Sequence, residues 1–410
     1  MPRILVSGAS IAGPALAHGL AGRGWETTVV ERFPALRDEG QNIDIRGAAR
    51  EVLRRTGLED AVRAATTGEQ GTRFVDARGR TVAEFPAGRS DSGGATAELE
   101  ILRGELSRIL YERTREHTEY VFGDRITGLD DHAGGVTVGF DRGPDRTFDV
   151  VVVAEGVTSR TRSLVFPAGV EVRGLGVYIA YLTLPRTATD TPWWRWYNAP
   201  GGRTVTLRPD NLGTTRATLT FLSDVGGLED LDAGDQAHVL RRTFADAGWE
   251  APRILAALDD GAFYFDAVGQ VRTPSWSRGR VALLGDAAYS PSPFSGMGTS
   301  LALVGAHVLA GELADDHRTA FARYEAILRP YVERAQKLPP GTPRLAHPRT
   351  RAGIAVLHGG LRLASRLARL DSPLFSPPAD AFELPEYVAI PTHVLQIDAA
   401  AEQGGDPQVK

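Results

Sequence analysis

The chain has 410 residues, of which 42% are hydrophobic and 24% charged, and a formal net charge of −5. This length predicts two or three domains, and the acidic balance excludes the strongly basic surface of a nucleic-acid-binding protein. The sequence has no cysteine, and its nine histidines do not fall at zinc-binding spacing, so we expect redox chemistry only through a bound organic cofactor.

No segment has the length and apolarity of a membrane span or a signal peptide. The apolar run at residues 4–6 is much shorter than the roughly 20 residues that cross a bilayer. We expect a cytoplasmic protein, a monomer or homodimer, without a membrane or nucleic-acid partner.

The first turn of the chain carries a dinucleotide-binding pattern. The apolar run at residues 4–6 is typical of a buried parallel strand, and it is followed by a helix with apolar residues at helical spacing. Gly8 allows a tight turn, Gly13 lets the helix approach the strand, and the free N–H groups of the helix face a pyrophosphate. Ser10 replaces the second glycine of the pattern, and its small hydroxyl can itself donate to phosphate.

A second expected strand, residues 27–31, ends in Glu31, eighteen residues after Gly13. An acid at this position can accept hydrogen bonds from a ribose diol. Strand, helix, strand and acid in this order predict a site for an ADP moiety.

The next part of the chain mixes helices and short strands. We expect, in order, a loop with a short strand (32–47), a helix (48–56), a hairpin (74–85), a mobile Gly/Ser-rich loop (90–95), a helix (102–115), and strands near 121, at 136–140 and at 148–154.

Residues 174–273 have a different pattern, with alternating polar and apolar residues typical of a mostly antiparallel sheet. We expect strands at 178–184, 194–197, 204–207, 215–222 and 263–266, with a helix at 233–247. One face of this sheet could be covered by a ligand or a helix.

Two further motifs follow buried strands. The valine run at residues 150–153 leads to Glu155-Gly156, and the strand at residues 280–284 leads to Gly285-Asp286 and a proline-containing loop. Asp286 can bond a ribityl hydroxyl. The N–H groups of Gly298 and Thr299 begin a helix and can stabilise negative charge on a bound ring.

Three helices are expected at the end of the chain, at residues 299–313, 318–337 and 351–369, and the last ten residues are expected to be disordered.

In the order and spacing of these three motifs the sequence resembles the class A flavin monooxygenases, which have the para-hydroxybenzoate hydroxylase fold. It is most similar to the short tetracycline-inactivating and aromatic-polyketide hydroxylases. The resemblance implies an α/β fold: a Rossmann-like FAD-binding domain with an inserted, mostly antiparallel substrate sheet and C-terminal helices. The expected divisions are an FAD-binding domain (1–75, 100–173 and 274–330), a substrate domain (76–99 and 174–273), a helical segment (331–400) and a disordered tail (401–410).

The resemblance also implies a non-covalent FAD site and a loop that positions the flavin. The implied FAD contacts are Gly8, Ser10, Ile11, Ala12, Gly13, Glu31, Arg32, Asp44, Arg46, Arg103, Glu155, Asp286, Gly298 and Thr299, and the loop residues are Pro293, Gly296 and Gly298. Glu155 replaces the usual aspartate and is one methylene longer.

NAD(P)H is expected as a transient reductant. Only one strand–turn–helix unit of the dinucleotide type is visible, and FAD occupies it. The nicotinamide should therefore bind over the flavin, near Arg37 or Arg46.

Aromatic residues on the inserted sheet are candidates for substrate contact. They are Tyr178, Tyr181, Trp194, Trp196, Phe221 and Tyr264. Trp194 and Trp196 share one strand face by the two-residue period, and core packing is the alternative role for each of these aromatics. No substrate base can be assigned from the sequence.

The expected function is an FAD-dependent monooxygenase that uses NAD(P)H and O₂, through a flavin C4a-hydroperoxide, to hydroxylate an apolar aromatic or polyketide-like molecule. Baeyer–Villiger insertion and epoxidation on the same fold remain open, as does a non-catalytic escort-type relative. A flavin halogenase is disfavoured because the W-x-W-x-I-P motif fails after Trp196.

Overall fold

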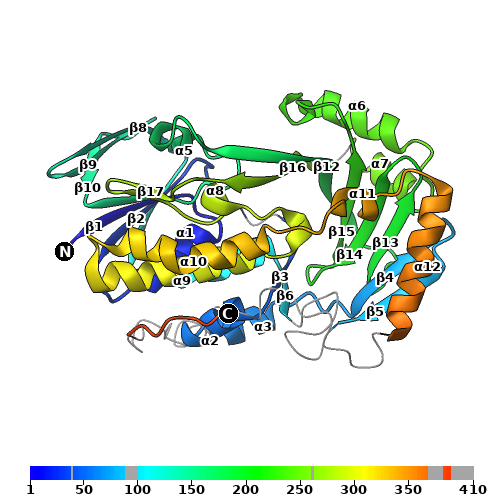
Figure 1. Cartoon of the computed structure of the whole chain (residues 1–410), viewed down its shortest axis with the longest axis horizontal. Helices are drawn as coiled ribbons and strands as arrows, with labels where there is room; N and C mark the ends of the chain where they lie inside the picture. The colour runs from blue at the N-terminus through cyan, green and yellow to red at the C-terminus, as the bar shows by residue number, and fades with distance from the viewer. Residues whose placement is uncertain (38–39, 88–98, 260–262, 368–381, 389–410) are drawn as a thin grey trace, which may run out of the picture.

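The computed structural model describes residues 1–37, 40–87, 99–259, 263–367 and 382–388 (Figure 1). The predicted Gly/Ser-rich loop at residues 90–95 and the predicted disordered tail at 401–410 lie outside these residues. Among the described residues, no helix combines the length and apolarity needed to cross a membrane.

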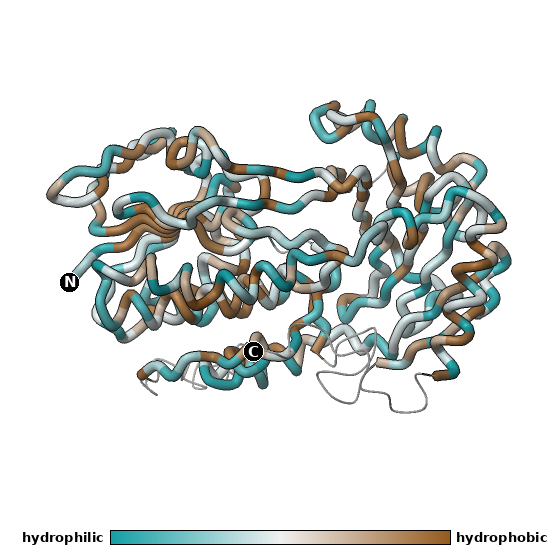
Figure 2. Tube along the Cα trace, in the orientation of Figure 1, coloured by the Kyte–Doolittle hydropathy of each residue, from teal (hydrophilic) through white to brown (hydrophobic). Residues whose placement is uncertain are grey.

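A six-stranded sheet in the order β17-β18-β11-β1-β2-β7 forms the nucleotide-binding half of the molecule. Its strands are β1 (Arg3–Ser7), β2 (Glu26–Glu31), β7 (Thr118–Phe122), β11 (Val150–Val153), β17 (Ser277–Arg278) and β18 (Val281–Leu283). All pairs are parallel except β17–β18. The branched residues of β1 and β11 are almost completely buried, and Figure 2 shows hydrophobic residues concentrated in these strands. Strands buried on both faces explain why both segments are continuous apolar runs.

Helix α1 (Ala12–Leu20) connects β1 to β2 and packs against α9 (Gly298–Asp316), which in turn packs against α10 (Ala320–Ala335). A Cβ placed on Gly19 of α1 would lie 2.7 Å from the Cβ of Ala310 on α9. The absence of a side chain at Gly19 therefore lets the two helices approach closely, which joins segments almost three hundred residues apart in the sequence.

The second large sheet has seven strands in the order β16-β12-β15-β14-β13-β4-β5. They are β4 (Gly71–Val75), β5 (Thr81–Pro86), β12 (Glu171–Pro185), β13 (Trp194–Ala199), β14 (Arg203–Pro209), β15 (Thr214–Leu222) and β16 (Phe263–Arg272). Only β4 and β13 pair in parallel. Long strands β12 and β16 extend toward the six-stranded sheet in Figure 1.

Helices cover one face of the seven-stranded sheet. Apolar residues of α6 (Ala233–Phe244) and α7 (Ala251–Ala256) share a buried cluster with Val205, Leu207 and Leu219 of the sheet. Helix α12 (Arg351–Leu367) packs along β5 and β13. The opposite face of the sheet carries Ile179 and Val268, against which Phe294 packs from the segment between Asp286 and α9.

The remaining elements are short. Two smaller sheets have the orders β10-β9-β8 and β3-β6. Their strands are β3 (Asn42–Ile45), β6 (Leu99–Leu102), β8 (Ile126–His132), β9 (Gly135–Phe140) and β10 (Arg146–Phe148). The other helices are α2 (Ala48–Arg55), α3 (Glu59–Ala64), α4 (Arg103–Glu112), α5 (Arg160–Val165), α8 (Asp286–Tyr289) and α11 (Thr342–Ala346). Two 3₁₀ turns are η1 (Leu228–Asp230) and η2 (Pro293–Ser295).

The pairing of β4 corrects one predicted boundary. The expected division at residue 75 assigned β4 to the FAD-binding domain, but β4 pairs with β13 and β5 in the seven-stranded sheet. A local hairpin pattern cannot show this, because the partner strand β13 lies more than a hundred residues away. The division into domains otherwise stays a prediction.

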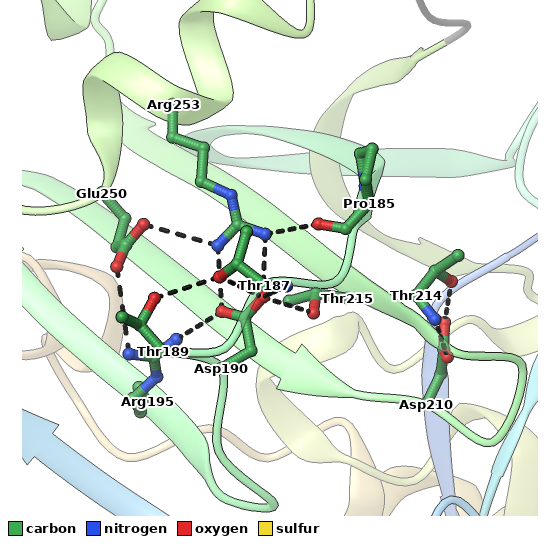
Figure 3. Close-up of polar contacts among 10 residues, drawn as sticks. All are labelled: Pro185, Thr187, Thr189, Asp190, Arg195, Asp210, Thr214, Thr215, Glu250 and Arg253. Carbon is green, nitrogen blue, oxygen red and sulfur yellow. Dashed lines mark hydrogen bonds and ion pairs between the residues drawn. The ribbon is translucent and has the colours of Figure 1, made fainter.

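A buried carboxylate fixes the connection between β12 and β13 (Figure 3). Asp190 accepts hydrogen bonds from the guanidinium groups of Arg195 (2.8 Å) and Arg253 (2.8 and 2.9 Å), from the Thr187 N–H (2.9 Å) and from the Thr215 hydroxyl (3.0 Å). These partners come from the connection itself, β13, β15 and α7. The Asp190 cluster, defined by these residues, therefore ties the end of the sheet to its covering helix.

Candidate active site

The turn between β1 and α1 has no room for side chains at its two glycines. Gly8 has a φ of +113°, and a Cβ there would lie 2.4 Å from the Ala154 carbonyl oxygen. A Cβ on Gly13 would lie 2.0 Å from the Gly8 carbonyl oxygen. No side chain caps α1 at Ile11. The first N–H groups of the helix, including those of Ala12 and Gly13, can therefore be satisfied by a pyrophosphate, and the turn fits an FAD diphosphate.

Glu31 lies beside this turn. One carboxylate oxygen accepts the Ala9 N–H at 2.9 Å and the other accepts the Phe33 N–H at 3.1 Å. These two bonds hold the carboxylate at the end of β2, where each oxygen keeps a lone pair for a ribose hydroxyl. The guanidinium of Arg32 lies over the Phe33 ring, 4.9 Å from its centre, so its contact with FAD stays a prediction.

Arg103 contacts the residue that departs from the glycine pattern. Its Nη1 donates to the Ser10 hydroxyl at 2.8 Å, and the Ser107 hydroxyl donates to the Ser10 carbonyl at 2.5 Å. A Cβ on Gly40 would lie 2.6 Å from the Arg103 Nε. The first turn of α4 is thus hydrogen-bonded to the turn between β1 and α1, which we call the pyrophosphate turn. The Arg103 guanidinium places a positive charge beside this turn.

Asp44 and Arg46 lie at the ribbon formed by β3 and β6. Their side chains form an ion pair at 3.0 Å, and the Arg46 N–H donates to the Ser300 hydroxyl of α9 at 3.4 Å. Asp44 is the register partner of Glu100 on β6. This ribbon is therefore placed between the start of α9 and the seven-stranded sheet.

The third motif forms a compact turn at the start of α9. Gly285 has a φ of +64° and Asp286 follows it, with Oδ1 3.8 Å from the position of a Cβ on Gly298. Burial raises the pKa of Asp286. Ser292 has a φ of +75°, which is uncommon for a side-chain-bearing residue, and Gly296 has a φ of +63°. No side chain caps α9, so the N–H groups of Gly298 and Thr299 can face a ligand.

Glu155 is engaged inside the chain. Its carboxylate accepts hydrogen bonds from the Ser7 hydroxyl (2.6 Å), the Ser159 hydroxyl (2.7 Å), and the Thr161 hydroxyl (2.6 Å) and N–H (3.1 Å). The extra methylene of glutamate lets the side chain reach back to β1 while it stabilises the start of α5. These contacts support a role in holding the turn, and a direct contact with a cofactor stays a prediction.

The predicted substrate residues divide between the two faces of the seven-stranded sheet. Tyr178 and Phe221 stack with ring centres 5.5 Å apart and lie in the buried cluster under α6, where Phe221 also contacts Phe244. The Tyr178 hydroxyl donates to Glu229 at 2.9 Å. Both side chains face the covering helix, so the prediction that they contact substrate is corrected to core packing.

The other predicted aromatics lie on the opposite face. Trp194 and Trp196 have ring centres 5.1 Å apart, which confirms that they share a face, and Tyr181 stacks with Tyr264 at 6.3 Å. Phe294, from the loop that follows Asp286, packs against the apolar residues of this face. The Phe294 contact joins the third motif to the aromatic face.

A buried charged cluster on this face was not found from the sequence. Arg208 of β14 lies over the Trp194 ring at 4.3 Å and pairs with Glu69 (2.8 Å), Glu100 (2.6 Å) and Asp44 (3.7 Å). We name these four ionisable side chains the Arg208 cluster. Alternation along β14 places Arg208 on the Trp194 face, but its acidic partners come from distant segments that no local pattern connects.

Comparisons with known proteins agree with this geometry. A family model described as an FAD-binding domain matches residues 2–338. The chain belongs to this family. It is 40% identical over 341 residues to a flavin-dependent monooxygenase from an unknown prokaryotic organism, covering 82% of this chain and 87% of the relative. It is also similar to the crystal structure of the tetracycline destructase Tet(55), with 35% identity, a TM-score of 0.78 and coverage of 94% and 99% of the two chains.

A further solved structure, Klebsiella pneumoniae HpxO complexed with FAD and uric acid, shares the fold at 22% identity and a TM-score of 0.72, with 92% and 97% of the two chains covered. The family, the relatives and the turn geometry together make this chain an FAD-dependent oxidoreductase of the flavin monooxygenase type. The predicted fold class, family and cofactor FAD are confirmed.

Proposed function

We propose that this FAD-dependent monooxygenase uses NAD(P)H and O₂ to hydroxylate an aromatic or polyketide-like small molecule. One observation carries the proposal: Phe294, from the loop that opens α9, packs on the same sheet face as Trp194, Trp196, Tyr181 and Tyr264. A flat apolar ligand held on this face would lie next to the flavin-positioning loop. Aromatic rings bury large areas against such ligands.

The chain's own residues would bind and orient the reactants. Arg103 and the N–H groups of α1 supply positive charge for the FAD diphosphate, while Glu31 and Asp286 supply acceptors for ribose and ribityl hydroxyls. The N–H groups of Gly298 and Thr299 would stabilise negative charge on the ring. Bound FAD supplies the redox and oxygen chemistry, and the protein excludes water around it.

The nicotinamide would bind transiently over the flavin. Within the described residues, β1–turn–α1 is the one strand–Gly-rich turn–helix unit whose next strand ends in an acid, Glu31, and FAD uses it. Arg37 and Arg46 are the candidate contacts for the nicotinamide nucleotide. Arg37 lies over the Phe33 ring at 4.6 Å, on the segment that follows β2.

Isotope labelling tests the proposed reaction. NADH and NADPH oxidation would be followed with a panel of phenols and aromatic polyketides, tetracycline included, under ¹⁸O₂. One labelled oxygen in a ring-hydroxylated product supports the proposal. A labelled lactone would replace it with Baeyer–Villiger insertion, and failure of both nucleotides to reduce the flavin would refute it.

FAD binding is tested separately by the visible spectrum. Arg103→Ala and Asp286→Ala should lower FAD occupancy without unfolding the chain. Arg108→Ala is the matched control, because Arg108 is on the same helix as Arg103 but half exposed and paired with Glu105. Equal occupancy in all three variants would contradict the assigned FAD contacts.

A further inference from the structure

Helix α12 presents large apolar side chains to solvent. Val356, Leu363 and Leu367 have exposed fractions of 77%, 60% and 48%, although another side of the helix packs along β5 and β13. At about 3.6 residues per turn, these side chains lie within about 40° of one another around the helix and span about 16 Å along it. We call these three residues the α12 strip. Four of the twelve exposed large hydrophobic residues in the described part of the chain lie within residues 345–367, so the strip is not a single stray residue.

The strip lies in a strongly basic part of the chain. Residues 334–370 contain eight lysines and arginines and no aspartate or glutamate, in a chain with a net charge of −5. Five of these cations belong to α11, α12 or the turn between them: Arg344, Arg349, Arg351, Arg362 and Arg366. Helix α12 forms one edge of the molecule, at the right in Figure 1. This edge therefore attracts anions although the protein as a whole is acidic.

Most of these five arginines keep their charge free for a partner. Within the described part of the chain, Arg349 is the one that pairs with an acid, Asp224, at 3.5 Å. Arg351, Arg362 and Arg366 are exposed. At helical spacing all three follow the same edge of the α12 strip. The helix thus combines an outward apolar face with a cationic flank that has no counterion among the described residues.

This combination limits what can cover the helix. A second copy of the chain would bring the same arginines against one another, because a two-fold interface places the same patch on both sides. An anionic lipid surface satisfies both features, since apolar side chains enter the acyl boundary while arginines stay at the headgroup phosphates. The expectation of no membrane partner rested on the length of apolar segments, and a helix that lies along a bilayer does not need a spanning length.

We propose that α12 binds an anionic lipid surface, with the α12 strip at the acyl boundary and Arg351, Arg362 and Arg366 at the lipid phosphates. Because α12 packs along β13, which carries Trp194 and Trp196, the substrate half of the molecule is the part held at the lipid. Apolar aromatic molecules of the proposed substrate class also collect in lipid, so enzyme and substrate would meet at one surface. Lipid binding itself does not depend on the reaction that the enzyme catalyses.

Flotation of the full-length, FAD-loaded protein with lipid vesicles tests this proposal. The probes are vesicles of phosphatidylcholine alone and vesicles of equimolar phosphatidylcholine and phosphatidylglycerol. The wild type should bind the anionic vesicles at least about tenfold more tightly, and added salt should weaken this binding. The double variant Arg362→Gln/Arg366→Gln should bind them about 20-fold more weakly. Val356→Ser/Leu363→Ser should bind them about tenfold more weakly, and both variants should retain the FAD spectrum because the changed side chains are exposed.

A matched control removes the same charge elsewhere. Arg142→Gln/Arg318→Gln changes two exposed arginines of the nucleotide-binding half, in the turns after β9 and α9, and should alter vesicle affinity less than about twofold. Equal losses in the two arginine pairs would assign binding to net charge and overturn the proposal. Equal binding of the wild type to both kinds of vesicle, or binding to neither, would also overturn it. Binding to soluble polyglutamate but to no vesicle would replace the lipid surface with an acidic protein partner.

Discussion

The Asp190 cluster and the Arg208 cluster are built from the same groups in opposite proportions. In the first, one carboxylate accepts bonds from two guanidinium groups, a backbone N–H and a hydroxyl (Figure 3). In the second, one guanidinium is shared by Glu69, Glu100 and Asp44. Burial alone raises the pKa of Asp190, but the bonds from Arg253, Thr187 and Thr215 outweigh it, so this pKa lies well below its usual value.

Glu100 responds in the other direction. Burial and the nearby charges of Glu69 and Asp44 raise the pKa of Glu100 to about 8, with burial as the main cause. The positive charge of Arg208 opposes this shift. The comparison shows that burial does not by itself determine the charge of an acid. The number of donors for each carboxylate decides whether the site keeps its charge or takes up a proton.

The largest expected effect comes from removing the charge of Asp190. Asp190→Asn removes the closer of the two anions that Arg195 and Arg253 share and leaves them only Glu250, at 3.9 and 3.5 Å. We expect a loss of about 3–5 kcal/mol in the free energy of unfolding, measured by urea denaturation. In the control Asp246→Asn, the carboxylate is 81% exposed and the loss should stay below about 1 kcal/mol. Equal losses of unfolding free energy in the two variants would show that the Asp190 cluster stabilises the fold no more than an exposed ion pair does.

Removing the single cation of the Arg208 cluster should cost less. In Arg208→Gln the three acids lose their shared partner, and Glu100 can take up a proton, so we expect a loss of about 2–4 kcal/mol at pH 8 and a smaller loss at pH 5. Urea denaturation at both pH values measures this. The matched control is Arg241→Gln, whose partner Asp259 is 70% exposed. A loss that does not depend on pH would contradict the proton uptake.

Glu100→Gln removes the group that binds the proton and keeps the size of the side chain. The unfolded chain releases this proton near the usual glutamate pKa of 4.5 and the folded chain only near a pKa of about 8, so between these values the folded state binds more protons. Wild-type stability should fall as pH rises through this window, whereas glutamine has no proton to lose. We expect the variant to gain about 1–2 kcal/mol relative to the wild type from pH 5 to pH 8.

Asp190→Asn should show the opposite pattern. Because the folded pKa of Asp190 is lowered, its stabilising effect is complete above the unfolded value of 3.8 and is lost only as pH falls below it. The cost of the substitution should therefore be constant from pH 5 to pH 8. Parallel pH profiles for the two variants would show that the clusters do not differ.

The smallest effect is expected on cofactor affinity. Asp44 joins the Arg208 cluster to Arg46 at the start of α9. Asp44→Asn should weaken FAD binding about three- to tenfold, roughly the net contribution of one ordinary hydrogen bond. Flavin fluorescence titration measures this, with Asp246→Asn as the control. Unchanged affinity would confine the cluster to a structural role.

The pyrophosphate turn could be predicted because its constraints are local. Gly13 is required by the carbonyl of Gly8, five residues earlier, and Gly8 by its own φ of +113°, so the sequence pattern carries both. The same holds for the paired face of Trp194 and Trp196, which follows from strand alternation alone.

The orientation of the sheet could not be predicted in the same way. Alternation places Tyr178 and Tyr181 on opposite faces, but only the packing of α6 and Phe294 determines which face is covered and which meets the site. Likewise, Arg208 and Glu69 are 139 residues apart, and their pairing depends on β4 joining the seven-stranded sheet. Long-range pairing of this kind leaves no signal in a short window.

The place of the second sheet in the chain has a consequence for synthesis on the ribosome. β11 ends at Val153, but its neighbour β18 begins only at Val281, after all seven strands of the other sheet. The nascent protein can complete the substrate sheet by Arg272 while the valines of β11 still present an unpaired edge. Such an edge is a site for wrong pairing between chains. The flavin-binding half is begun first and completed last. A chain interrupted before β18 therefore carries a finished substrate sheet and a nucleotide-binding sheet with an exposed, unpaired apolar edge.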